Sequence, residues 1–197
     1  MIRTASTTSR ATPLVAAPSA GASGLVAWYA EGFSDALGDR LRLFDNRGPA
    51  LELLRFSDAV IAIPGFEAAL RSRVELLAGF KHPSFARIRA LRIMDDPPAP
   101  RLALVSELVA GERVSSMLRT AQARGVRLDT TSAVWLLRQL LPPLAAIHDA
   151  GDGVVHGLLD PDRVVVTAGG EVVITEHVFG GVADLSLIHI SEPTRRS

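Results

Sequence analysis

Residues 154–174 read VVHGLLDPDRVVVTAGGEVVI, and this stretch decides how the C-terminal half of the chain folds. Two valine-rich runs, 163–166 and 172–174, flank the turn sequence Ala168-Gly169-Gly170. Short β-branched runs on either side of a glycine-rich turn are typical of a β-hairpin. The stretch therefore predicts a hairpin, preceded by a loop that holds Asp160 and Asp162.

A long helix is predicted upstream of that hairpin, over about 131–150. Apolar side chains recur there at steps of three and four, which places them on one face of the helix. Those residues are Val134, Leu137, Leu141, Leu144 and Ile147. We expect this face to pack into the core. We also expect Pro142-Pro143 to kink the helix, because proline lacks the backbone N–H that a helix uses.

The N-terminal half reads as strands, one helix and then more strands. Alternating apolar residues and regularly spaced turn residues predict a β-meander over 25–56. A helix is predicted from Pro64-Gly65 to about Gly79, followed by strands over about 87–94 and 101–108. After Gly111 the pattern becomes helical. This order predicts an α+β fold in which a β-rich lobe joins a helical one.

The composition excludes several classes of chemistry. The 197 residues carry no net charge and include no cysteine, so neither thiol catalysis nor a zinc–thiolate site is available. Balanced charge produces no dominant field for nucleic acid, and we expect no nucleic-acid partner. Lys81 is the only lysine and Asn46 the only asparagine. No activity can therefore depend on a lysine before Lys81 or on an asparagine after Asn46.

The two ends of the chain differ from its middle. Residues 1–24 are rich in Ser, Thr, Ala, Pro and Gly, hold no acidic residue, and are expected to be disordered. No run of about 18 apolar residues occurs, so we expect no membrane segment within this chain. Residues 185–197 resemble translated sequencing-adapter read-through, and we expect this tail not to be native protein. The predicted domain is therefore 25–184.

Several short sequences occur in the order that they have in protein kinases. They are residues 81–83 (KHP), 104–109 (LVSELV), 147–151 (IHDAG) and 156–164 (HGLLDPDRV). The last aligns with the kinase sequence H-R-D-L-K-P-E-N-I, so the chain resembles the protein kinase superfamily, in particular bacterial Ser/Thr kinase-like domains. The resemblance implies a bilobal fold, with an N-lobe of antiparallel sheet and one helix over about 25–109. The helical C-lobe, about 110–184, would be incomplete, and we expect it to expose apolar side chains.

The residues that phosphoryl transfer needs are replaced at the matching positions. Leu54 or Arg55 stands for the lysine, Arg73 for the helix glutamate, Leu158 for the catalytic aspartate and Arg163 for the asparagine. The composition already excludes that lysine and that asparagine, whatever the alignment. The resemblance therefore implies a pseudokinase, a kinase-like regulatory domain that catalyses no transfer, needs no cofactor and acts by binding a protein partner.

A second hypothesis retains nucleotide binding. Glu176 stands where the kinase D-F-G motif has its metal-binding aspartate, so its carboxylate could hold a metal ion. The hinge backbone at Glu107 and Val109 would then help to hold ATP. His156 is expected to be structural, as the equivalent histidine is in kinases. This alternative is a nucleotide-binding protein with residual or unorthodox transferase activity that depends on ATP and a metal.

Glu52 bears on the choice between these hypotheses. If residues 51–54 (LELL) overlay the kinase V-A-I-K, a carboxylate replaces the small residue over the adenine pocket, and nucleotide binding is weakened. If the register differs by one residue, Glu52 points to solvent instead. Under either hypothesis we expect the domain in the cytoplasm, alone or as the cytoplasmic part of a longer membrane-anchored protein.

Overall fold

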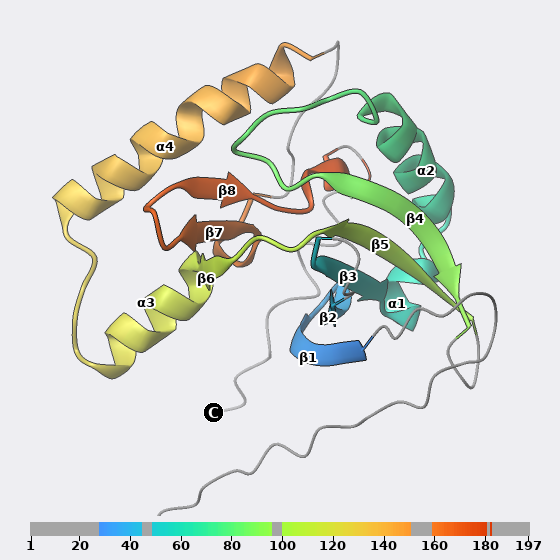
Figure 1. The fold of residues 1–197 in the computed structure, drawn as a ribbon, viewed down its shortest axis with the longest axis horizontal. Helices are drawn as coiled ribbons and strands as arrows, with labels where there is room; N and C mark the ends of the chain where they lie inside the picture. The colour runs from blue at the N-terminus through green and yellow to red at the C-terminus, as the bar shows by residue number, and fades with distance from the viewer. Residues whose placement is uncertain (1–27, 45–48, 96–99, 151–158, 181, 183–197) are drawn as a thin grey trace, which may run out of the picture.

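Five antiparallel strands form the larger of two sheets (Figure 1). The computed structural model of the protein describes residues 28–44, 49–95, 100–150, 159–180 and 182. The strands lie in the order β1-β2-β3-β5-β4. Their bounds are β1 (Trp28–Asp35), β2 (Gly38–Phe44), β3 (Leu51–Phe56), β4 (Ile88–Met94) and β5 (Arg101–Glu107). Three short connections and one helical crossover between β3 and β4 are enough to build this sheet.

The crossover from β3 to β4 contains the helices α1 (Asp58–Ile61) and α2 (Phe66–Leu76). α2 begins after Gly65, whose backbone is left-handed at φ 78° and therefore suits glycine. Phe66 and Leu70 occur four residues apart on the helix and are both buried. This face of α2 packs against the sheet and places the helix beside β4 (Figure 1).

The second half of the chain contains a three-stranded antiparallel sheet and two helices. The elements are β6 (Gly111–Arg113), α3 (Val114–Ala123), α4 (Thr130–His148), β7 (Val164–Thr167) and β8 (Val172–Ile174). Single 3-10 turns precede β7 (Pro161–Arg163) and follow β8 (His177–Phe179). α3 and α4 flank the small sheet on opposite sides (Figure 1).

Backbone hydrogen bonds and one continuous core join the two halves. The Ile174 N–H donates to the Ser84 carbonyl and the Ala86 N–H donates to the Ile174 carbonyl, each over 2.8 Å. Beyond β8, the ring of Phe179 meets Phe56 of β3 edge to face, with centroids 5.9 Å apart. The segment that follows β8 is therefore clamped between the large sheet and α2.

The sequence-based expectation of an α+β fold is confirmed. The β-meander, the helix after Gly65, the next two strands, the long helix and the final hairpin all occur near the expected positions. The structure adds α1 and β6, which are too short to produce a periodic signal. The expectations for 1–24, 185–197, His156 and Leu158 lie outside the described residues. Within the described part of the chain, no helix has the length and apolar character to cross a membrane.

The expected core face of α4 is wrong over most of its length. Val134, Leu137 and Leu141 are 39%, 55% and 61% exposed. Ile147 of the expected face is buried and Leu144 packs partly buried against the core, whereas the other buried residues of the helix are Leu140 and Pro143. Because apolar residues occur on nearly every side of this helix, their spacing alone could not select the face that packs.

Two neighbouring leucines of α4 test this assignment. We expect Leu140→Ala to lower the free energy of unfolding by about 2–4 kcal/mol, because it empties a site that is only 7% exposed. We expect Leu141→Ala to change it by less than about 1 kcal/mol, because that side chain is largely in water. Urea unfolding measures both, and equal losses would contradict the packing described here.

Candidate functional site

Glu176 is the focus of the candidate site. It lies two residues after the end of β8 and is the only non-glycine residue with positive φ (55°) in the described part of the chain. A left-handed backbone at such a residue costs of order 1–2 kcal/mol and persists only where surrounding contacts hold it. Its side chain is 1% exposed. A strained, fully buried carboxylate therefore needs strong partners.

Arg40 of β2 is the first partner of Glu176. Its Nε donates to Glu176 Oε1 over 2.6 Å and its Nη2 donates to Oε2 over 2.8 Å. This two-pronged geometry matches the planar guanidinium to the planar carboxylate. The Arg40 side chain has no exposed surface, so a pair of buried charges joins the large sheet to the end of β8.

Arg163, in the turn before β7, is the second cation of the cluster. Its Nε lies 3.3 Å from Glu176 Oε2, and its Nη1 forms an ion pair with Asp160. Asp35, at the end of β1, contacts both arginines, at 3.0 Å from Arg40 and 3.7 Å from Arg163. We call Arg40, Arg163, Asp35, Asp160 and Glu176 the ionic cluster.

The hairpin between β1 and β2 aims Arg40 and Asp35 at this cluster. Asp35 Oδ1 accepts the N–H groups of Leu37 and Gly38 over 2.9 and 3.3 Å, which fixes its orientation. Gly38 has φ 145°, and a Cβ there would lie 2.0 Å from the Arg55 carbonyl oxygen. No other residue fits that turn, so the position of the cluster depends on this glycine.

A bulge in β1 brings Phe33 over the arginine. The β1–β2 register shifts between Glu31 and Ser34, and such a bulge turns a side chain away from its regular direction. The Phe33 ring lies 4.4 Å from the Arg40 guanidinium and 4.6 Å from that of Arg113. Phe33 therefore joins two cations through cation–π contacts.

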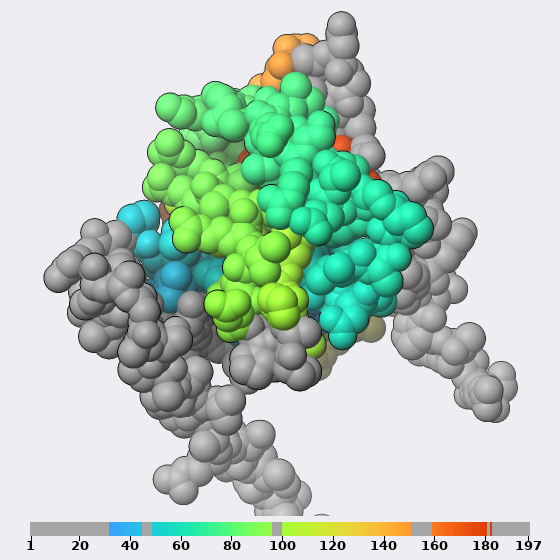
Figure 2. Space-filling view, turned by 90° about the vertical axis from the view of Figure 1, so that its right-hand side faces the viewer, coloured from blue at the N-terminus to red at the C-terminus, as the bar shows by residue number. Residues whose placement is uncertain are grey.

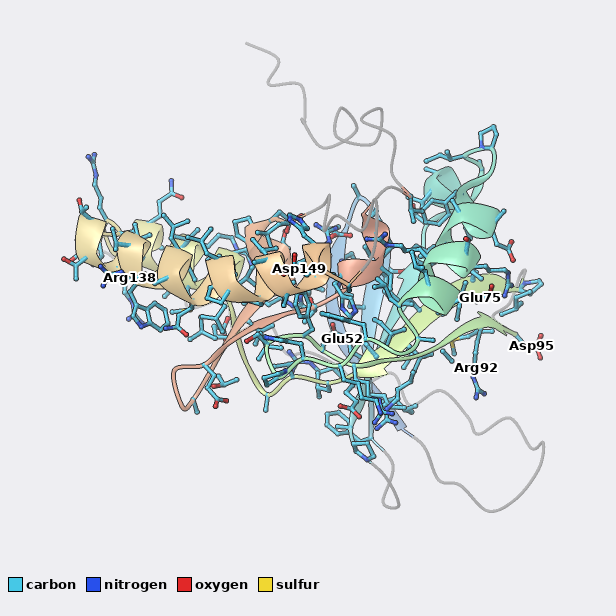
Figure 3. All side chains as sticks on the ribbon, turned by 90° about the horizontal axis from the view of Figure 1, so that it is seen from above. Glu52, Glu75, Arg92, Asp95, Arg138 and Asp149 are labelled. Atoms are coloured by element: carbon cyan, nitrogen blue, oxygen red, sulfur yellow. The ribbon has the colours of Figure 1, made fainter. Side chains whose placement is uncertain are left out.

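Arg113, at the end of β6, ties the two halves of the chain together. It donates to Glu52 Oε1 of β3 over 2.5 Å, to the Asp162 carbonyl, and to Thr175 Oγ1 over 3.4 Å. Glu52 is 8% exposed, so the predicted alternative in which it points to solvent is wrong. Figure 3 shows Glu52 in the middle of the molecule, where the two halves meet.

A small cavity of about 170 Å³ lies beside the ion pair of Glu52 and Arg113. Its walls include Phe33, Glu52, Arg113, Val109 and Thr175. Pockets that bury a drug-sized ligand have volumes of about 300–1,000 Å³. This cavity, which residues from both halves of the chain line, is therefore smaller than such a pocket.

Burial and charge act against each other in the ionic cluster. Burial alone would raise the pKa of Asp35, but its contacts with Arg40, the Leu37 N–H and Arg163 together hold that pKa below its usual value. Burial also opposes the charge on Arg40, and Glu176 and Asp35 outweigh it and raise the pKa of Arg40. For Arg163, burial prevails over the attraction of Glu176 and lowers the pKa.

The structure brings together only some of the site residues expected from the sequence. Arg163 and Glu176 meet in the ionic cluster. Leu54 is 2% exposed and belongs to the hydrophobic core, and Arg73 of α2 is 7% exposed. His156 and Leu158 are not among the described residues.

The two residues expected to form the hinge, Glu107 and Val109, line different cavities. Val109 lines the cavity beside Glu52, whereas Glu107 lines a separate groove and its carboxylate pairs with Arg89. The Glu107 N–H already donates to the Arg87 carbonyl over 2.9 Å. Only Val109 is therefore placed at the cleft.

Sequence reasoning missed Arg40, Arg113, Phe33 and Asp35. Side chains two apart on a strand lie on the same face, and Arg42 in β2 is exposed, yet Arg40 is 1% exposed. One available signal was the charge pair Asp35 and Arg40 on facing strands of a short hairpin. That signal could suggest a surface pair but not its burial beneath a segment 136 residues away.

No protein-family model matches this sequence, and no curated protein matches it. Among the described residues, no group of three or more His, Asp or Glu side chains is arranged to hold a metal ion. Both oxygens of Glu176 instead face guanidinium groups. The chemistry that this arrangement supports is charge pairing, which locks the two halves of the molecule.

The ionic cluster is tested by removing its central carboxylate. We expect Glu176→Ala to lower the free energy of unfolding by about 3–5 kcal/mol, because it leaves two buried cations facing each other. The control Glu171→Ala changes an exposed residue in the hairpin turn and should cost less than about 1 kcal/mol. Denaturant unfolding of both variants is the measurement, and a loss for Glu176→Ala no larger than the control's would refute the lock.

Acid should weaken the same cluster. The pKa of Asp35 is lower in the folded protein than its ordinary value of 3.8, so its stabilising effect is complete above that value and is lost as the pH falls through the folded-state pKa. We expect Asp35→Asn to be less stable than wild type near neutral pH and to lose less stability on acidification below about pH 4. Urea unfolding from about pH 6 to about pH 3 measures this, and an unchanged pH slope would show that Asp35 does not contribute.

Proposed function

We propose that this chain is a kinase-like domain that has lost phosphoryl transfer and acts as a protein-binding, regulatory module. The order of its elements supports the proposal. In kinases the lysine lies on the third strand and its glutamate partner on the helix that follows. Here β3 is the third strand and α2 the next long helix, with Leu54 and Arg73 at the matching positions.

The observation that carries the proposal is the pairing of Glu176 with Arg40 and Arg163. A magnesium ion needs free carboxylate oxygens, and a nucleotide brings anionic phosphates that follow the metal. To admit them, the Glu176 carboxylate would have to break its two hydrogen bonds with buried Arg40, at 2.6 and 2.8 Å. Removing one partner from a buried pair costs about 3–5 kcal/mol, which corresponds to a loss of affinity of roughly a hundredfold to several thousandfold. The donor set therefore does not fit a magnesium–nucleotide group.

The small size of the cavity supports the same proposal. Glu52 places a negative charge beside the cavity that Val109 lines, and its partner Arg113 lines the same cavity. A nucleotide would have to displace this pair as well as enter about 170 Å³. Side chains that tie β3, β6 and the end of β8 together favour a rigid scaffold over a catalytic cleft that opens and closes.

Titration calorimetry of the purified chain with Mg-ATP tests the proposal. We expect no saturable heat at millimolar nucleotide and no increase in melting temperature, because a ligand that binds only the folded state would raise it. We also expect radiolabelled phosphate transfer from ATP to stay at the level without protein.

Matched variants make the result interpretable. Saturable Mg-ATP binding by the wild type that is lost in Glu176→Ala but kept in the exposed-site control Glu171→Ala would overturn the proposal. Binding of that kind would instead support the alternative, a kinase-like protein that holds nucleotide and metal through Glu176 and the hinge at Glu107 and Val109.

A further inference from the structure

Two cavities occur on the other side of the segment that carries Glu176. One has a volume of about 390 Å³ and lies where the loop after α2 meets β5. The other, of about 230 Å³, lies between the end of α2 and the start of β4. Both are lined by Phe80, Arg87 and His177, so they are two parts of one groove. Figure 2 looks onto the face of the molecule where α2 and β4 lie side by side. We call this groove the back groove.

Aromatic rings form one wall of the larger cavity. Phe80 stacks on His82 with the ring planes 6° apart and the centroids separated by 6.4 Å. Phe85 meets Phe80 edge to face at 5.3 Å and His177 at 5.0 Å. Mutual contacts hold these four rings in place, so the wall is preformed and costs little ordering entropy when a ligand binds.

Aliphatic side chains line the smaller cavity. Val74 comes from α2, Leu77 and Ala78 from the turn after it, and Ile88 from the first position of β4. This lining suits a large apolar side chain, because burying one typically contributes about 1.5–3 kcal/mol. The back groove thus offers an apolar recess next to an aromatic wall.

The charge of the back groove is positive, although the chain as a whole has no net charge. Lys81 and Arg87 line it and are exposed. Glu107 is the only acidic residue among its described lining residues, and Arg89, which also lines it, pairs with that carboxylate. Lys81 and Arg87 therefore remain as an excess of positive charge around the apolar recess.

We propose that the back groove binds an acidic peptide segment of a partner protein, with a large apolar side chain seated between α2 and β4. Charge complementarity selects this occupant, because carboxylates on the peptide would meet Lys81 and Arg87 while its apolar side chain fills the recess. The inference rests on the proposed function, since it names the surface and the chemical class of the protein partner. The ionic cluster and the cleft play no part in it.

Fluorescence polarisation with a defined probe tests the inference. The probe is a fluorescein-labelled peptide, EEDFEDWEE. In the first control peptide Ser replaces the aromatic residues. In the second control peptide Lys and Gln replace the acidic residues. We expect saturable binding of the probe alone, weakened by added salt because the charges involved are exposed.

Matched variants locate the binding site. Arg87→Glu and Lys81→Glu should each weaken probe binding about tenfold, whereas Arg127→Glu, the same change at an exposed position between α3 and α4, should not. Ala78→Trp should block the smaller cavity, and Ala68→Trp, at an exposed position on α2, should leave binding unchanged. Circular dichroism checks that each variant is folded.

Each outcome bears on the inference separately from the proposed function. The inference is overturned if the probe does not bind, if the aromatic-free peptide binds equally well, or if Arg87→Glu and Arg127→Glu behave alike. Mg-ATP is titrated in parallel. Nucleotide binding with unchanged probe binding would remove the proposed function and leave the groove, whereas absence of both would remove the groove alone.

Discussion

The buried pair of Arg40 and Glu176 is the interaction on which the rest of the structure depends. It joins β2 to the segment after β8, 136 positions later in the chain, through two charge-assisted hydrogen bonds. Both charges are out of water, so neither can be left alone without a large desolvation penalty. Arg163, Asp35 and Asp160 complete the compensation. The left-handed backbone at Glu176 is retained because these contacts determine where its carboxylate must lie.

The same ion pair is connected, through neighbouring side chains, to the cavity beside Val109. Arg40, which Glu176 holds, contacts the Phe33 ring, and Arg113 contacts the same ring. Arg113 then reaches Glu52 and closes the cavity beside Val109. These side chains thus form a connected scaffold of paired charges and cation–π contacts.

Consecutive residues serve the two faces of the molecule. Glu176 points to the ionic cluster, while His177 lines both parts of the back groove. Phe179 follows and packs against Phe56 in the core. The short segment after β8 therefore carries one residue of the ionic cluster, one residue that lines the back groove and one residue of the core.

The sequence by itself determined the α+β order of elements, the hairpin at Ala168-Gly169-Gly170 and the exclusion of a lysine- or asparagine-dependent transfer reaction. Those conclusions depend on local periodicity, turn chemistry and composition, which can be read directly from the sequence. Only the tertiary structure decided that Arg40 is buried, that Glu52 pairs with Arg113, and that Leu140 packs while Leu141 is exposed. Burial and charge pairing depend on which distant segments meet, because the same side chain is stable in water or in the core according to its partner.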